Sequence, residues 1–287
     1  MHGHAFRLEL PESITTSAVF ASPHSGRDYP PAFLSRSILD AHAVRSSEDA
    51  FMDWLVADAP ACGAPLLLAM APRAYVDLNR SSDELDPALI EGLRRSMPNP
   101  RISSGLGVIP RVVSNGRAIY RGKLTLAEAE ERLQKVWHPY HAALQGLLQD
   151  QINRFGEAIL FDMHSMPHDA IASYGQRGRA IPEVVIGDRF GASAAGWIVD
   201  AVERVFAESG LRTARNAPFA GAFVTQHYGR PSKRQHVVQI EIDRALYMNE
   251  GTLELRPAFA AVQRTMGRIV AALAEIGRRE SRLAAAE

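Results

Sequence analysis

The sequence predicts an α/β layered fold in one large domain. Short apolar runs alternate with longer stretches of helical periodicity, which is the pattern of a sheet covered by helices. Of the 287 residues, 46% are hydrophobic, which is enough for a sizeable core. The chain has no internal repeat and no convincing linker. We therefore expect a single domain over residues 1–287, with its core at about 15–275, rather than two domains.

Five apolar runs predict the strands of the sheet, because each is short and bounded by polar or turn-forming residues. They are residues 18–21, 66–70, 159–164, 184–186 and 237–242.

Helical periodicity predicts four helices between and after these strands. They cover residues 46 to about 63, 125 to about 151, about 191–209 and about 251–285. Thr125 and Glu128 have the spacing of a capping box at the start of the second helix, which we expect to bend or break before Pro139. Gly210 is expected to cap the third helix. Residues 81–124, rich in Pro, Gly, Asn and Ser, predict a long functional loop region.

Composition excludes several classes of function. Lys+Arg and Asp+Glu are both 32, so no basic field is available for a nucleic acid or a membrane surface. Cys62 is the sole cysteine, which excludes an intrachain disulfide and a thiolate metal cluster. No targeting segment is visible, and the longest apolar run, residues 64–72, is too short to span a bilayer. We expect a soluble cytoplasmic protein with no nucleic-acid or membrane partner.

Two histidines stand where chemistry is expected in such a fold. His24 follows the first predicted strand and His164 ends the third, and ligands of open α/β sheets bind outside the carboxyl ends of strands. Small residues follow both histidines, Ser25 and Gly26 after His24 and Ser165 after His164. Imidazole is a common zinc ligand, and a catalytic zinc site takes three protein ligands plus an open position. We expect both rings to converge on one ion, with a carboxylate as the third ligand because thiols are absent.

Several motifs, in the same order along about residues 20–250, resemble the N-formylglutamate amidohydrolase family. They are Ser22-Pro-His24-Ser-Gly26, residues 48–53, Pro72-Arg-Ala-Tyr-Val-Asp-Leu-Asn-Arg80, Asp162-Met-His-Ser-Met-Pro167, Ile186-Gly-Asp-Arg-Phe-Gly191, Asn216-Ala-Pro-Phe-Ala-Gly221, Tyr228-Gly-Arg-Pro231 and residues 238–248. The resemblance implies a zinc-carboxypeptidase-like (phosphorylase/hydrolase-like) three-layer fold with a mixed, mostly parallel sheet between helices. It also implies one zinc ion that hydrolyses an amide.

One departure concerns the third metal ligand. The carboxypeptidase pattern has a glutamate three residues after the first histidine, and this position holds Arg27 here. We expect Asp49 instead, because the spacing from Asp49 to Asp53 resembles the start of the family's helix; Glu48 and Asp28 remain open as alternatives.

Two residues are assigned to the chemical step by the resemblance. Glu241 matches the strand-borne glutamate that acts as general base in zinc carboxypeptidases. A carboxylate inside the apolar strand 237–242 is costly to bury unless it is paired, coordinated or poised for proton transfer. Gln239, Glu241 and Asp243 share one face of that strand, which a solvated face would also explain. Arg73 resembles the arginine that polarises the scissile carbonyl in related acylases.

Four further residues are candidates for holding the substrate. Asn79 and Arg80 place an amide and a guanidinium side by side, a pair suited to gripping a carboxylate. Tyr228 is expected to donate a hydrogen bond to the intermediate, and Arg230 to meet a second carboxylate.

The resemblance implies hydrolysis of N-formyl-L-glutamate to L-glutamate and formate, as in the last step of a histidine degradation route. The alternatives are a hydrolase of another N-acyl amino acid or short peptide, and a non-catalytic binding relative of the fold. The sequence leaves open the acyl group, whose pocket we expect within residues 81–124. It also leaves open the metal (zinc, cobalt, manganese or iron) and the choice between a monomer and a small homo-oligomer.

Overall fold

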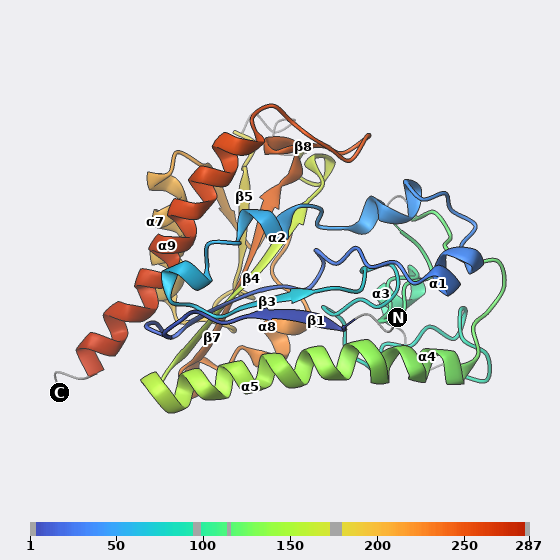
Figure 1. The fold of residues 1–287 in the computed structure, drawn as a ribbon, viewed down its shortest axis with the longest axis horizontal. Coiled ribbons are helices and arrows are strands. Elements are labelled where there is room, and N and C mark those ends of the chain that lie inside the picture. Colours follow the sequence, from blue (N-terminus) through green and yellow to red (C-terminus); the bar gives the residue numbers. More distant parts are fainter. Residues whose placement is uncertain (1–3, 94–98, 114–115, 173–179, 285–287) are drawn as a thin grey trace. The chain divides into compact units, whose positions relative to one another are not determined.

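A computed structural model of the chain describes residues 4–93, 99–113, 116–172 and 180–284 (Figure 1). The chain forms two compact units, each built from separate stretches of sequence. One unit comprises Met1–Arg7, Pro23–Ala50 and Leu68–Ala143, and the other Leu8–Ser22, Phe51–Leu67 and Leu144–Glu287. The expectation of a single domain over residues 1–287 stays a prediction.

A seven-stranded sheet has the order β1-β3-β2-β4-β7-β5-β6. Its strands are β1 (Phe6–Glu9), β2 (Ala18–Ser22), β3 (Leu66–Ala69), β4 (Ala158–Met166), β5 (Val184–Gly187), β6 (Thr213–Arg215) and β7 (Gln235–Asp243). A small second sheet pairs β8 (Met248–Asn249) with β9 (Glu254–Leu255).

The pairing of the strands confirms the predicted α/β class with a mixed, mostly parallel sheet. Strand β4 pairs in parallel with β2 and with β7, β5 pairs in parallel with β6, and β5 runs antiparallel to β7. The predicted strands are all present. Strands β4 and β7 extend beyond their predicted bounds at both ends through further buried residues, and in β7 these are the polar Gln235, His236 and Asp243. Strands β1 and β6 were not predicted, since their residues are half-buried or exposed and show no apolar run.

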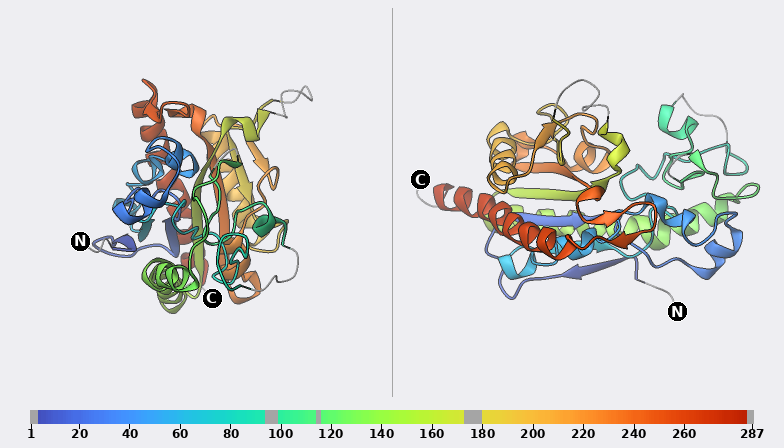
Figure 2. Two further views of the ribbon diagram at one scale, coloured as in Figure 1. Left: turned by 90° about the vertical axis from the view of Figure 1, so that its right-hand side faces the viewer. Right: turned by 90° about the horizontal axis from the view of Figure 1, so that it is seen from above.

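In the larger unit, helices pack against this sheet. Helix α9 (Phe259–Ala284) contacts β2, α2 (Met52–Leu55) and α7 (Gly196–Glu208), and α7 and α9 lie side by side (Figure 1 and Figure 2). Helix α8 (Phe223–Tyr228) lies against β7.

The core between β2 and β4 includes Phe20 and Phe161, whose ring centroids are 5.2 Å apart. None of the described helices combines the length and the apolar character that a bilayer crossing needs.

In the smaller unit, the elements are short. They are α1 (Pro31–Arg36), η1 (Ala43–Ser47), α3 (Pro100–Ser103), α4 (Leu126–Arg132) and the π-helical η4 (Leu133–Trp137), which leads into α5 (His138–Phe155). The capping box of Thr125 and Glu128 is present, as predicted. The expected break before Pro139 takes the form of the π-helical stretch, a common site of helix distortion.

The helix predicted from Ser46 to about Gly63 is wrong. This stretch forms η1, then α2, then the 3₁₀ turn η2 (Pro60–Cys62). Phe51 has a φ of 64°, a left-handed conformation that a continuous right-handed helix excludes. The backbone N–H of Asp49 donates to the carbonyl of His24 (3.0 Å) instead of to a carbonyl one helical turn earlier. The irregular segment therefore holds Asp49 beside His24.

Candidate functional site

His24 lies just beyond β2, and its ring is buried. Its Nε2 lies 2.7 Å from Oδ1 of Asp77. The chain can turn here because of Gly26: a Cβ at this position would lie only 2.2 Å from the carbonyl oxygen of Ala71. The Ser-Pro-His-Ser-Gly motif thus ends in a glycine that the close approach of another backbone segment requires.

Asp49 is also buried, and its Oδ2 lies 3.6 Å from Nδ1 of His24. The alternative ligand Glu48 has its carboxylate engaged elsewhere, because it accepts two hydrogen bonds from Arg45 (both 3.0 Å) and one from Tyr29 (2.6 Å).

The other alternative ligand, Asp28, is exposed. The bonds that engage Glu48 and the exposure of Asp28 therefore favour Asp49 as the donor beside His24.

His164 lies on β4, and its side chain is buried. Its Nε2 is 3.0 Å from Oδ2 of Asp162, two residues earlier on the same face of the strand. Asp162 is fully buried, and its carboxylate oxygens have no other partner among the described residues. A buried carboxylate of this kind is stable only beside a group that carries a proton or a positive charge.

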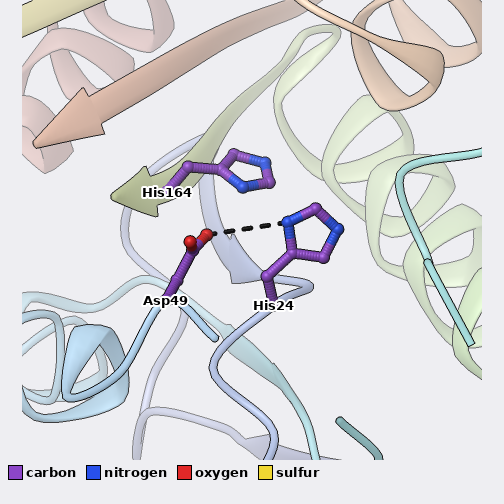
Figure 3. Close-up of side chains that lie close together, drawn as sticks. All are labelled: His24, Asp49 and His164. Carbon is purple, nitrogen blue, oxygen red and sulfur yellow. Dashed lines mark ion pairs between the residues drawn. The ribbon is translucent and has the colours of Figure 1, made fainter. Parts of the chain in front are cut away.

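His24, Asp49 and His164 each offer one ligand atom, and these atoms lie within 4.8 Å of one another (Figure 3). Two imidazole nitrogens and a carboxylate oxygen are a typical donor set of a catalytic zinc site with an open fourth position. In both rings a carboxylate engages Nε2, that of Asp77 or Asp162, so a metal would be coordinated through Nδ1. Such carboxylate–histidine pairs fix the tautomer of metal-binding histidines. The group is therefore chemically suited to a divalent metal ion.

We expect an Asp162→Asn variant to bind a divalent metal ion about 10- to 100-fold more weakly, because the neutral amide removes the negative charge that lies 3.0 Å from Nε2 of His164. Competition against a chelator of known affinity measures this change. Asp169→Asn, a change of an exposed acid seven residues later, is the matched control. Equal metal affinity for the two variants would contradict the assignment.

Asp77 organises several of the predicted residues in the smaller unit. Its Oδ1 accepts the backbone N–H of Asn79 (2.9 Å), and its Oδ2 accepts Nε of Arg73 (2.9 Å). Burial of the Asp77 carboxyl raises its pKa, but Arg73, His24 and Arg80 more than offset this and hold the pKa well below its usual range. Asp77 is thus an ionised acceptor that joins His24 to Arg73.

Arg80 is buried, and part of its guanidinium is hydrogen-bonded to backbone carbonyls. Its Nε donates to the carbonyl of Leu106 (3.1 Å) and its Nη1 to that of Asn79 (2.8 Å). Trp137 Nε1 donates in turn to the carbonyl of Arg80 (2.9 Å). Burial lowers the pKa of Arg80, against the opposing effect of Asp77. These two bonds use Nε and Nη1 of the guanidinium and do not involve Nη2.

Glu241 lies on β7 directly across from His164 on β4, and the side chains of such register partners point to the same face of the sheet. Only 9% of Glu241 is exposed, and its Oε1 accepts Nε2 of Gln239 (2.9 Å). Gln239, Glu241 and Asp243 are all buried, which excludes the alternative interpretation of this strand face as solvated.

Tyr228 and Arg230 lie near the other end of β7. The carbonyl of Tyr228 accepts Nε2 of Gln235 (2.7 Å), and the backbone of Arg230 pairs with that of Gln235. Gln235 precedes Glu241 by six residues, or about 20 Å along the strand. Burial raises the pKa of the Tyr228 hydroxyl. The substrate-binding roles of Tyr228 and Arg230 stay predictions.

Three residues without a predicted role now stand beside the candidates: Asp77, Asp162 and Gln239. The sequence held a signal for two of them, because Asp162 and Gln239 each lie two residues before a candidate on the same strand and so share its face. Of the region 81–124, in which we expect the acyl pocket, residues 94–98 and 114–115 lie outside the described residues.

Comparison with known proteins agrees with the motifs. The family model described as N-formylglutamate amidohydrolase matches residues 16–248. An N-formylglutamate deformylase of Pseudomonas aeruginosa is 30% identical over 241 residues, which cover 81% of this chain and 82% of that protein. A Pseudomonas putida protein of the same name is 29% identical over 191 residues, 66% of each chain.

A solved structure agrees as well. The crystal structure of N-formylglutamate amidohydrolase from Ralstonia eutropha JMP134 matches with a TM-score of 0.87 and 37% identity, covering 96% of this chain and 98% of that one. The resemblance inferred from the motifs is confirmed, and this chain belongs to the N-formylglutamate amidohydrolase family.

Proposed function

We propose that the protein is a zinc-dependent amidohydrolase that converts N-formyl-L-glutamate and water to L-glutamate and formate. The observation that carries this proposal is the buried donor set of His24, Asp49 and His164 in a chain whose relatives are named for this reaction. Its partner is then a small N-acyl amino acid that carries carboxylates, and its place is in histidine degradation.

The chemistry required is the attack of water on the formyl carbon, followed by cleavage of the C–N bond. His24, Asp49 and His164 would hold the zinc ion, which would supply Lewis acidity and lower the pKa of water toward about 7. Glu241 takes a proton from the attacking water and delivers it to the departing amine nitrogen.

The remaining residues of the proposal handle charge. The guanidinium of Arg73, oriented by Asp77, stabilises the negative oxygen of the tetrahedral intermediate. Asn79 and Arg80 hold a substrate carboxylate. Because most of these groups are buried, their electrostatic effects are larger than they would be in water.

The substrate is tested by comparing N-formyl-, N-acetyl- and N-succinyl-L-glutamate with enzyme of measured metal content. We expect kcat/KM for the formyl substrate to exceed that for the acetyl substrate by about tenfold or more, as one additional methyl group in a closed pocket can produce. A preference for a larger acyl group would establish the N-acyl amino acid alternative. Metal-loaded protein that hydrolyses none of the three would support the binding relative.

A further inference from the structure

We propose that Gln239 is a positioning residue for Glu241, and that the motifs at 186–191 and 216–221 hold Gln239 in place. The inference rests on the proposed role of Glu241 as the base. It gives a task to two motifs that the metal donors and the substrate contacts leave unexplained.

The side chains of Gln239 and Glu241 are in direct contact. Gln239 and Glu241 alternate onto the same face of β7, and Nε2 of Gln239 donates to Oε1 of Glu241 at 2.9 Å. Only 3% of Gln239 is exposed, so water does not readily replace this bond. A hydrogen bond to an ionised acceptor is among the stronger ones, and it fixes the rotamer of the carboxylate.

A second hydrogen bond fixes the orientation of the Gln239 amide. Its Oε1 accepts the backbone N–H of Ala222 at 3.2 Å. Because an amide carries its acceptor and its donors at opposite ends, the Ala222 contact forces the NH₂ group to face Glu241. In the reverse orientation two oxygens would meet. Ala222 thus decides that Gln239 is a donor to the base.

Gly187 allows the segment that carries Ala222 to lie close to Gln239. Gly187 pairs with Gln239 in the antiparallel register of β5 and β7. A Cβ on Gly187 would lie 2.8 Å from the carbonyl carbon of Ala220. Only glycine therefore lets the segment that contains Ala220 and Ala222 pass so close to the sheet. Gly221 has a φ of +108°, a conformation that L side chains rarely adopt.

Hydrogen bonds join the motif at 186–191 to the motif at 216–221. Nδ2 of Asn216 donates to Oδ1 of Asp188 (2.6 Å), and the N–H of Asp188 donates back to Oδ1 of Asn216 (3.0 Å). The N–H of Arg189 donates to the carbonyl of Ala220 (2.8 Å). These bonds fasten one motif to the other directly after Gly187, and so they support the segment that aims the Ala222 N–H.

The support matters because general-base catalysis depends on placement. The bond from Gln239 holds the carboxylate of Glu241 through Oε1. A misplacement of about 1 Å at a reacting group costs as much as about 10²-fold in rate.

The test is a Gln239→Met variant, which keeps a similar side-chain length but neither donates nor accepts the two bonds. We expect kcat to fall about 10- to 100-fold, with KM and metal content unchanged within about twofold. Gln235→Met is the matched control, because Gln235 is buried on the same strand but bonds to the carbonyl of Tyr228. Unchanged kcat in Gln239→Met, or an equal loss in Gln235→Met, overturns the proposal.

A double-mutant cycle separates this proposal from the proposed function. If Gln239 acts through Glu241, adding Gln239→Met to Glu241→Gln lowers kcat by less than about twofold further. Additive losses overturn the positioning role while leaving Glu241 as the base. Full activity of Glu241→Gln alone overturns the base itself, and the positioning role with it.

The glycine gives an independent check. We expect Gly187→Ala to lower kcat at constant KM, since it displaces the segment that carries Ala222. Gly146→Ala is its control, because a Cβ on Gly146 meets no atom within 4 Å.

Discussion

A Glu241→Gln enzyme is expected to lose about 10²–10⁴ of its turnover and to keep its metal ion. The amide has nearly the shape of the carboxylate but accepts no proton at neutral pH, so only the chemical step is affected. Glu241 is not among the three grouped ligand atoms, which is why metal content is expected to be unchanged.

The measurement is kcat on N-formyl-L-glutamate together with metal content per chain. Glu208→Gln, which neutralises an exposed glutamate at the end of α7, controls for the loss of one negative charge. Turnover of Glu241→Gln within a few fold of the Glu208→Gln value would remove Glu241 from the mechanism.

A His164→Ala enzyme is expected to show the opposite signature, the loss of both the metal and the activity. Removing one of the three proposed protein ligands leaves a site that cannot complete its coordination, and Asp162 then faces no imidazole. We expect hydrolysis near the uncatalysed background and a metal content far below that of the unsubstituted protein.

Elemental analysis after dialysis measures the metal, and His138→Ala, at an exposed histidine at the start of α5, is the control. The unsubstituted protein, stripped by a chelator, should regain activity when zinc is added back. A His164→Ala enzyme that retained stoichiometric metal would refute the proposed ligand set, whatever its activity.

The central strands could be predicted from the sequence because buried strands consist largely of continuous apolar residues. Strands β4 and β7 carry long apolar runs, and His164 and Glu241 could be placed on them by position alone. Side chains alternate between the two faces of a strand, so Asp162, two residues before His164, could also have been predicted to lie beside it.

Other features depend on contacts that no local pattern contains. The bond between His24 and Asp77 joins residues 53 positions apart, and nothing in either segment specifies it. The helix expected after Ser46 failed for a related reason: the left-handed Phe51 and the bond from Asp49 to His24 override the local helical pattern. The strands β1 and β6 have too few buried apolar residues to be recognised.

The two acceptor oxygens of Asp77 have a consequence for how this chain can vary over evolution. One oxygen serves an imidazole and the other a guanidinium, so a single side chain supports two different tasks. A substitution there disturbs both at once, and no lone second-site change can restore both geometries. We therefore expect fewer amino-acid substitutions to be tolerated at Asp77 than at either His24 or Arg73, the two side chains that it orients.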